Sequence, residues 1–251
     1  MNNANGGSRR GVADVVFLLD ATGSMAPCID AIRRGICDFV RELEGHSLGS
    51  TPIIRDWRAR VVAYRDRPDC EDDWIEEHPF VRSAEQLATQ LTAISAHGGG
   101  TEPESLLDAL HRLAVSPPAD PETVGGAMRW RPRHQAHRVI IVFTDATFHP
   151  SFRLPGATAS ADILDVVDVR ESLQDAGVWL HLFTPEFDCY ESLSEMDRCN
   201  WNSLPLELVD DPAFEAQATG AWTLRRLVER SEEFNEILRQ LGKSVSLSTN
   251  C

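Results

Sequence analysis

The stretch VADVVFLLDATGSM, which runs from Val12 to Met25, decides the fold of this chain. Its first eight residues are apolar except for Asp14. Such a run is typical of a strand that is buried on both faces of a parallel sheet. The run ends at Asp20, and Gly23 permits a tight turn soon after it. The stretch therefore predicts an α/β fold in which a polar loop follows the first strand.

Apolar runs of the same kind recur along the chain and alternate with segments of helical period. We expect further strands at 57–64, 137–144, 178–184 and, at one edge, 204–209, with a hairpin partner around Phe80 and Val81. The spacing of apolar residues predicts helices over 26–43, 83–94, 103–115, 162–176, 190–197 and 221–241. This alternation predicts a doubly wound, mostly parallel central sheet that is flanked by helices on both faces, with one antiparallel edge strand.

The domain organisation follows from the even composition of the chain. No shift in composition marks a second domain, so we expect a single domain over residues 13–242. Residues 116–136 are rich in Pro and Gly and are predicted as a surface insertion. Residues 1–12 and 243–251 are predicted as flexible tails.

The charge balance and the cysteines restrict the partners and the compartment. The chain has 24 Lys and Arg against 39 Asp and Glu, a net charge of −15. This charge opposes binding to nucleic acid and to anionic membranes. The N-terminus lacks the apolar core of a signal peptide, and no apolar stretch is long enough to span a membrane. The six cysteines form no Cys-x-x-Cys pair, which favours reduced thiols in the cytoplasm.

Oxygen-bearing side chains follow three of the predicted strands or lie in the loops beside them. Asp20, Thr22 and Ser24 alternate after the first strand, Thr101 follows three glycines, and Asp145 ends the strand over 137–144. In an open α/β sheet, ligands bind outside the carboxyl ends of the strands. Hard oxygen ligands suit magnesium, manganese or calcium rather than zinc or copper. The five residues therefore predict a site for one divalent cation.

Together these motifs resemble the metal-ion-dependent adhesion site of von Willebrand factor type A (VWA) domains. The first motif spans Asp20 to Met25, the second Gly98 to Thr101, and the third Thr144 to Ala146. The usual first motif has Ser where this chain has Thr22, and the hydroxyl is kept. The resemblance covers roughly residues 14–209 and carries weight because the order and the strand context of all three motifs agree.

A closer likeness exists to the intracellular VWA domains that accompany α-kinases. It rests on Tyr64-Arg65-Asp66, on the Gly-Gly-Gly-x-x-Pro-Glu segment that ends at Glu104, and on Asp145 to His149. Many members of that branch carry Asp where this chain has Thr101. The likeness implies no kinase activity for this chain.

The resemblance implies how the cation is held and what it does. Thr22 and Ser24 touch the metal directly, Thr101 does so directly or through water, and Asp20 and Asp145 act largely through water. The open coordination position takes a carboxylate from a partner protein, so we expect a cytoplasmic adaptor or regulatory subunit without catalysis. The expected partner-binding rim consists of Met25, Asp66, Gly100, Glu102 and His149.

Other interpretations of the same residues stay open on the sequence alone. Asp20 also fits the nucleophile of a magnesium-dependent phosphatase, although Thr22 stands where such enzymes carry a second Asp and Lys243 is the only lysine. Asp20, Thr22 and Ser24 also fit a simple helix cap. The basic and aromatic segment over 129–138 fits nucleic acid, a partner contact or a cap over the core.

Overall fold

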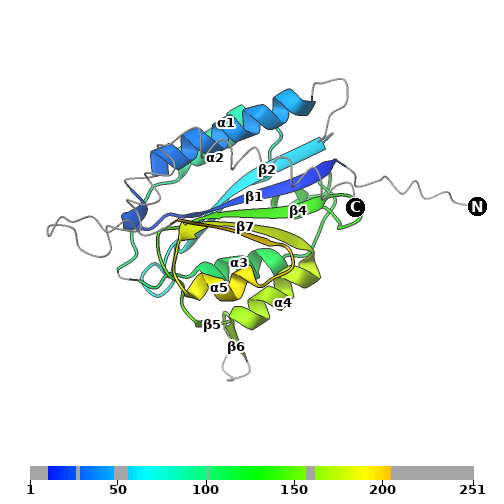
Figure 1. Ribbon diagram of the computed structural model, residues 1–251. Helices are drawn as coiled ribbons and strands as arrows, with labels where there is room; N and C mark the ends of the chain where they lie inside the picture. Colours follow the sequence, from blue (N-terminus) through cyan, green and yellow to red (C-terminus); the bar gives the residue numbers. More distant parts are fainter. Residues whose placement is uncertain (1–10, 27–28, 48–55, 101, 157–161, 205–251) are drawn as a thin grey trace, which may run out of the picture.

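A six-stranded sheet forms the centre of the molecule, with the strand order β3-β2-β1-β4-β7-β8 (Figure 1). The computed structural model describes residues 11–26, 29–47, 56–100, 102–156 and 162–204. The strands of this sheet are β1 (Val12–Asp20), β2 (Asp56–Tyr64), β3 (Ile75–Glu77), β4 (His137–Phe143), β7 (Val178–Pro185) and β8 (Cys199–Leu204). All neighbours are parallel except β3, which runs antiparallel to β2 at one edge. The predicted α/β class and the mostly parallel sheet are therefore confirmed.

Helices connect these strands, and a small hairpin lies apart from the main sheet. The helices are α1 (Ile29–Ser47), α2 (Ala84–Ala93), α3 (Leu106–Val115), α4 (Val166–Ala176) and α5 (Cys189–Ser194), with the 3-10 turns η1 (Gly23–Met25) and η2 (Gly126–Met128). The hairpin pairs β5 (Ser151–Arg153) with β6 (Ile163–Asp165) in antiparallel fashion. The predicted helix over 221–241 and the predicted tail over 243–251 lie outside the described residues, as do residues 1–10.

Strand β1 lies between two apolar clusters because its side chains alternate between the faces of the sheet. Val15, Phe17 and Leu19 pack in a cluster that includes residues of α1 and α2. Val16 and Leu18 pack in a second cluster that includes residues of α3 and α4. In Figure 1, α1 and α2 lie on one side of the sheet, and α3, α4 and α5 lie on the other. This burial on both sides explains why β1 is almost wholly apolar.

Asp14 interrupts the apolar run of β1 because it is the centre of a buried ion-pair network. Its carboxylate accepts hydrogen bonds from Nε and a terminal nitrogen of Arg58, both at 2.8 Å. It also accepts from the backbone N–H of Arg131 at 2.8 Å and from its Nε at 2.7 Å. Trp130 is fully buried and donates its indole N–H to the Leu113 carbonyl. The buried Trp130, Arg131 and Arg138 of the segment over 129–138 thus cap the core.

Several predicted boundaries were displaced. The hairpin partner of β2 is β3 rather than the segment around Phe80 and Val81, where Val81 forms only a single bridge with Ala59. Strand β8 begins at Cys199, five residues before the predicted edge strand, and residues 205–209 lie outside the described part. Helix α4 begins at Val166 rather than 162 because Asp165 caps it in a capping box. The hairpin of β5 and β6 was predicted as loop and helix start.

Two further features bear on the sequence-based expectations. No helix in the described part of the chain is long and apolar enough to cross a membrane. Cys37, Cys70, Cys189 and Cys199 are free thiols.

Candidate functional site

The loop after β1 is organised around the carboxylate of Asp20. Its Oδ1 accepts hydrogen bonds from the backbone N–H of Thr22 at 2.9 Å and from the Thr22 hydroxyl at 2.6 Å. Its Oδ2 accepts from the hydroxyl of Thr144 at 2.7 Å. In the parallel register Leu19 pairs with Phe143, so the residues that follow them, Asp20 and Thr144, meet at the same edge of the sheet. Asp20 is completely buried, so it holds the loop in place from the side of the core.

Ser24 connects this loop to the end of β4. Its hydroxyl donates to Oδ1 of Asp145 at 3.1 Å and lies 3.1 Å from the hydroxyl oxygen of Thr22. Each hydroxyl carries one hydrogen and two lone pairs, and each lies within hydrogen-bond distance of a carboxyl group: Thr22 of Asp20, Ser24 of Asp145. Thr22 and Ser24 also form a hydrogen bond with each other, in which either hydroxyl can be the donor. Ser24 is exposed, so this pair of oxygens opens toward solvent.

The second loop packs directly against the first. The Gly23 N–H donates to the Gly98 carbonyl at 2.8 Å. Gly99 has φ of +70°, and a Cβ on it would lie 2.7 Å from Cγ2 of Thr22. Only glycine fits this close approach in a left-handed conformation. Thr101 lies outside the described residues, although Gly100 is placed by its N–H, which donates to Oδ2 of Asp69 at 2.8 Å.

The site gathers several buried acidic side chains. Burial, followed by the charge of Asp20, raises the pKa of Asp145 to about 8. Burial also raises the pKa of Asp20, although hydrogen bonds from Thr22 and Thr144 lower it in part. For Glu104, burial and then the charges of Asp20, Asp66, Asp145 and Glu102 raise the pKa to about 9. A cation placed among these carboxyl groups would offset their mutual repulsion and lower their pKa values.

The oxygen donors fit a hard divalent cation with few direct anionic ligands. Two buried carboxylates and two hydroxyls are brought together, and such a donor set suits magnesium, manganese or calcium. Within the described residues, no three His, Cys, Asp or Glu side chains are grouped so that they could hold a metal. The fit therefore rests on the hydroxyls of Thr22 and Ser24, with Asp20 and Asp145 supporting them.

The predicted rim is only partly at the surface. Met25 is fully buried in the core beside α1, so its assignment to the rim was wrong. Asp66 is also buried, and its Oδ1 accepts from the Ser105 hydroxyl at 2.9 Å and lies 2.8 Å from Nε2 of His149. Glu102 is exposed and accepts from the N–H and hydroxyl of Thr147. Gly100, Glu102 and part of His149 are the rim residues that a partner can reach.

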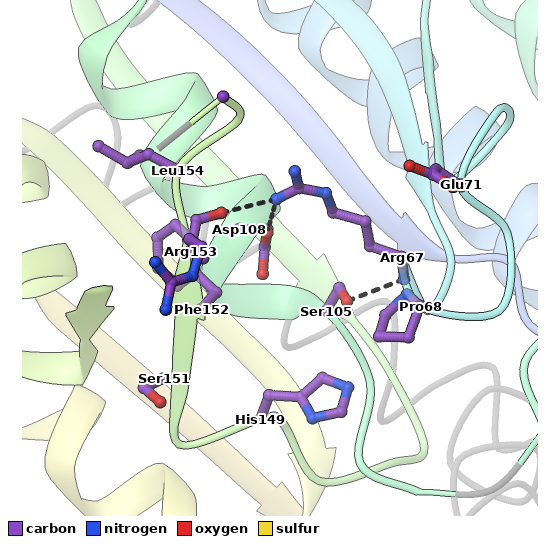
Figure 2. Close-up of a pocket in the computed structure, with 11 residues that line it drawn as sticks. Arg67, Pro68, Glu71, Ser105, Asp108, His149, Ser151, Phe152, Arg153 and Leu154 are labelled. Atoms are coloured by element: carbon purple, nitrogen blue, oxygen red, sulfur yellow. Dashed lines mark hydrogen bonds and ion pairs between the residues drawn. The ribbon is translucent and has the colours of Figure 1, made fainter. Parts of the chain in front are cut away.

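A pocket of about 500 Å³ lies beside this rim and shares His149 with it (Figure 2). Arg67 crosses the pocket, and one of its terminal nitrogens donates to Oδ1 of Asp108 at 2.8 Å and to the Arg153 carbonyl at 2.9 Å. The hairpin strand β5 forms one wall of the pocket. Sequence reasoning missed this pocket because it depends on that hairpin.

Thr144 and Glu104 belong to the motifs identified in the sequence, but neither was predicted as a residue of the site. The signal for Thr144 was its position directly after an apolar strand, next to Asp145. The signal for Glu104 was an acidic residue close before the apolar helix α3.

Comparisons with known proteins show the fold alone. The sequence matches no protein-family model and no curated protein. The structure is similar to the pilus adhesin SpaC from Lactobacillus rhamnosus GG in its open conformation, with 14% identity and a TM-score of 0.50 over 87% of this chain and 30% of the adhesin. It is also similar to proximal thread matrix protein 1 from the mussel byssus, with 14% identity and a TM-score of 0.50 over 91% of this chain and 46% of that protein. This chain thus spans less than half the length of either protein.

Proposed function

We propose that this chain is a doubly wound VWA-type domain that binds one divalent cation, and that the cation holds a carboxylate of a partner protein. Magnesium is the proposed ion, with manganese or calcium as substitutes. The observation that carries the proposal is the contact between the hydroxyl oxygens of Thr22 and Ser24. Each of these oxygens has two lone pairs, so the two hydroxyls side by side can offer neutral oxygen ligands to a cation.

Burial and charge support the same proposal. Asp20 and Asp145 are 0% and 2% exposed, and burial, followed by the charge of Asp20, raises the pKa of Asp145. Buried charges are usually paired or coordinate metals. A cation with mainly neutral direct ligands stays electrophilic, and when bound it supplies a Lewis-acidic position for an incoming carboxylate.

The exposed side of the site gives the partner access. Ser24, Gly100 and Glu102 lie at the surface, and the pocket beside His149 has room for residues that flank the partner's carboxylate. Arg67 in that pocket offers a guanidinium whose remaining N–H groups can bind an acidic neighbour. We therefore propose an adaptor or regulatory role in a larger assembly.

A phosphatase that uses Asp20 as a nucleophile is less well supported. Asp20 is completely buried, and both of its oxygens accept hydrogen bonds from threonine side chains. A nucleophilic carboxylate must reach the phosphorus atom of its substrate, and these bonds hold Asp20 away from solvent.

A peptide selection tests the proposed function. Random peptides displayed on phage are selected on the full chain in magnesium, and the selected peptides are then measured individually. We expect them to contain Asp or Glu, and to lose binding in a chelator, after Asp or Glu in the peptide is changed to Asn or Gln, and on the Asp145→Asn chain. Peptides that bind equally under all these conditions would contradict the proposal.

A further inference from the structure

Glu104 lies between the second and third loops of the candidate site and ties them together. Its N–H donates to the Thr147 carbonyl at 2.9 Å, and its carbonyl accepts from the N–H of His149 at 3.0 Å. Glu104 also forms a parallel β-bridge with Phe148. It lies two residues before the start of α3. The backbone therefore fixes the position from which the Glu104 side chain extends.

The carboxyl group of Glu104 lies beside Thr22. Oε1 is 3.0 Å from the point where a Cβ on Gly99 would stand, and Cγ2 of Thr22 is 2.7 Å from the same point. The whole residue is only 4% exposed. Glu104 and Thr22 thus both lie against Gly99 of the second loop.

The second oxygen of this carboxyl, Oε2, is buried and has no hydrogen-bond partner among the described residues. A buried carboxyl with a purely structural role is normally paired with a donor, because leaving it unpaired costs several kcal/mol. The charges that act most strongly on Glu104 are those of Asp20, Asp66 and Asp145, which are all negative. The site therefore holds a buried carboxyl group that lacks a partner, and a nearby cation would stabilise its ionised form.

We propose that Glu104 is an additional acidic residue of the cation site, and that it stabilises the bound ion through its charge rather than by direct contact. The inference rests on the proposed function. Direct contact is not proposed because the described acidic side chains are not grouped closely enough to form a metal cage. Glu104 joins Asp20 and Asp145 as a third negative group around the hydroxyls of Thr22 and Ser24.

The test compares manganese and magnesium binding by isothermal titration of the full chain with binding by the Glu104→Gln variant. Replacing an outer group of a metal site typically costs about tenfold to hundredfold in metal affinity, and we expect a loss in that range. The unfolding midpoint without metal should not fall, because the variant removes only an unpaired acid. A purely structural role would instead lower this midpoint and leave the metal affinity unchanged.

Asp108→Asn is the matched control because Asp108 is also a buried acid near the site, but it is paired with Arg67. This variant should keep the metal affinity of the unchanged chain. Glu104→Asp keeps the charge and should retain part of the affinity that Glu104→Gln loses. An unchanged affinity in Glu104→Gln, together with a lost affinity in Asp145→Asn, would overturn the inference and leave the proposed function standing. Absence of metal binding by the unchanged chain would overturn both.

Discussion

Ser24 donates a hydrogen bond to Asp145 at 3.1 Å although 121 positions of sequence separate the two residues. The parallel pairing of β1 and β4 brings them together, since Leu19 lies opposite Phe143 in the register. The site is therefore assembled by the sheet rather than by any one loop. A change that displaces one loop should be measurable as a loss of metal affinity even where no oxygen ligand is altered.

Gly99→Ala should disable the site without removing a ligand. The alanine would adopt φ near +70° and place its Cβ 2.7 Å from Cγ2 of Thr22. The left-handed backbone costs about 1–2 kcal/mol, and the overpacking adds about 1–3 kcal/mol. We expect a loss of manganese affinity, measured by titration calorimetry, and a lower free energy of unfolding, measured in urea.

Gly125→Ala is the matched control for this variant. Gly125 has φ of +75°, and a Cβ on it would meet nothing within 4 Å. The control should therefore lose only the backbone part of the stability and should bind manganese as the unchanged chain does. Equal metal affinities for the two variants would show that the close approach of Gly99 to Thr22 does not matter.

Asp14→Ala should destabilise the fold and leave the chemistry of the site untouched. Removing Asp14 leaves the buried guanidinium of Arg58 without this carboxylate, and Arg131 keeps only its ion pair with Asp56. Breaking a buried pair in this way costs about 3–5 kcal/mol. Urea unfolding should show this loss, whereas Asp38→Ala, which breaks an exposed pair with Arg41, should cost less than about 1 kcal/mol. A small effect of Asp14→Ala would mean that the network does not contribute to stability.

His181 should make the stability depend on pH between 4 and 6.5. Both ring nitrogens are buried without a partner among the described residues, and burial lowers the pKa of His181 from 6.5 to about 4. Below pH 6.5 the unfolded chain binds a proton that the folded chain does not bind, so stability falls as the pH falls toward 4. At about pH 5 the loss is about 2 kcal/mol.

The variant His181→Leu should remove this part of the pH dependence. Urea unfolding at pH 7 and pH 5 should show a smaller difference for His181→Leu than for the unchanged chain. The exposed His134 provides the control, and His134→Gln should keep the full difference. An identical pH dependence in all three proteins would rule out a contribution from His181.

The sequence predicted the sheet and the position of the site because both depend on local patterns. Apolar runs marked β1, β2, β4 and β7, and polar residues directly after β1 and β4 marked the edge where Asp20 and Asp145 meet. Strand ends on one edge of a parallel sheet are neighbours wherever they lie in the chain.

Other features were not predictable because they depend on tertiary contacts. One of the two partners of Asp14 is Arg131, which is 117 positions away, and nothing in the local sequence links the two. Met25 was assigned to the rim because it follows Ser24, but the turn η1 directs it into the core. The hairpin of β5 and β6 lacks an apolar alternation, so the pocket that it lines was also missed.

Titration of the metal-free chain with manganese, by isothermal calorimetry, is the most direct test of whether a divalent cation binds beside Asp20 and Asp145. We expect that the unchanged chain binds one ion, and that Asp20→Asn and Asp145→Asn each lose this binding while they keep the folded circular dichroism spectrum. A ligand that binds only the folded state also raises stability, by about 2.7 kcal/mol at a hundredfold excess over its dissociation constant. No binding by the unchanged chain, or equal binding by all three proteins, would contradict the account.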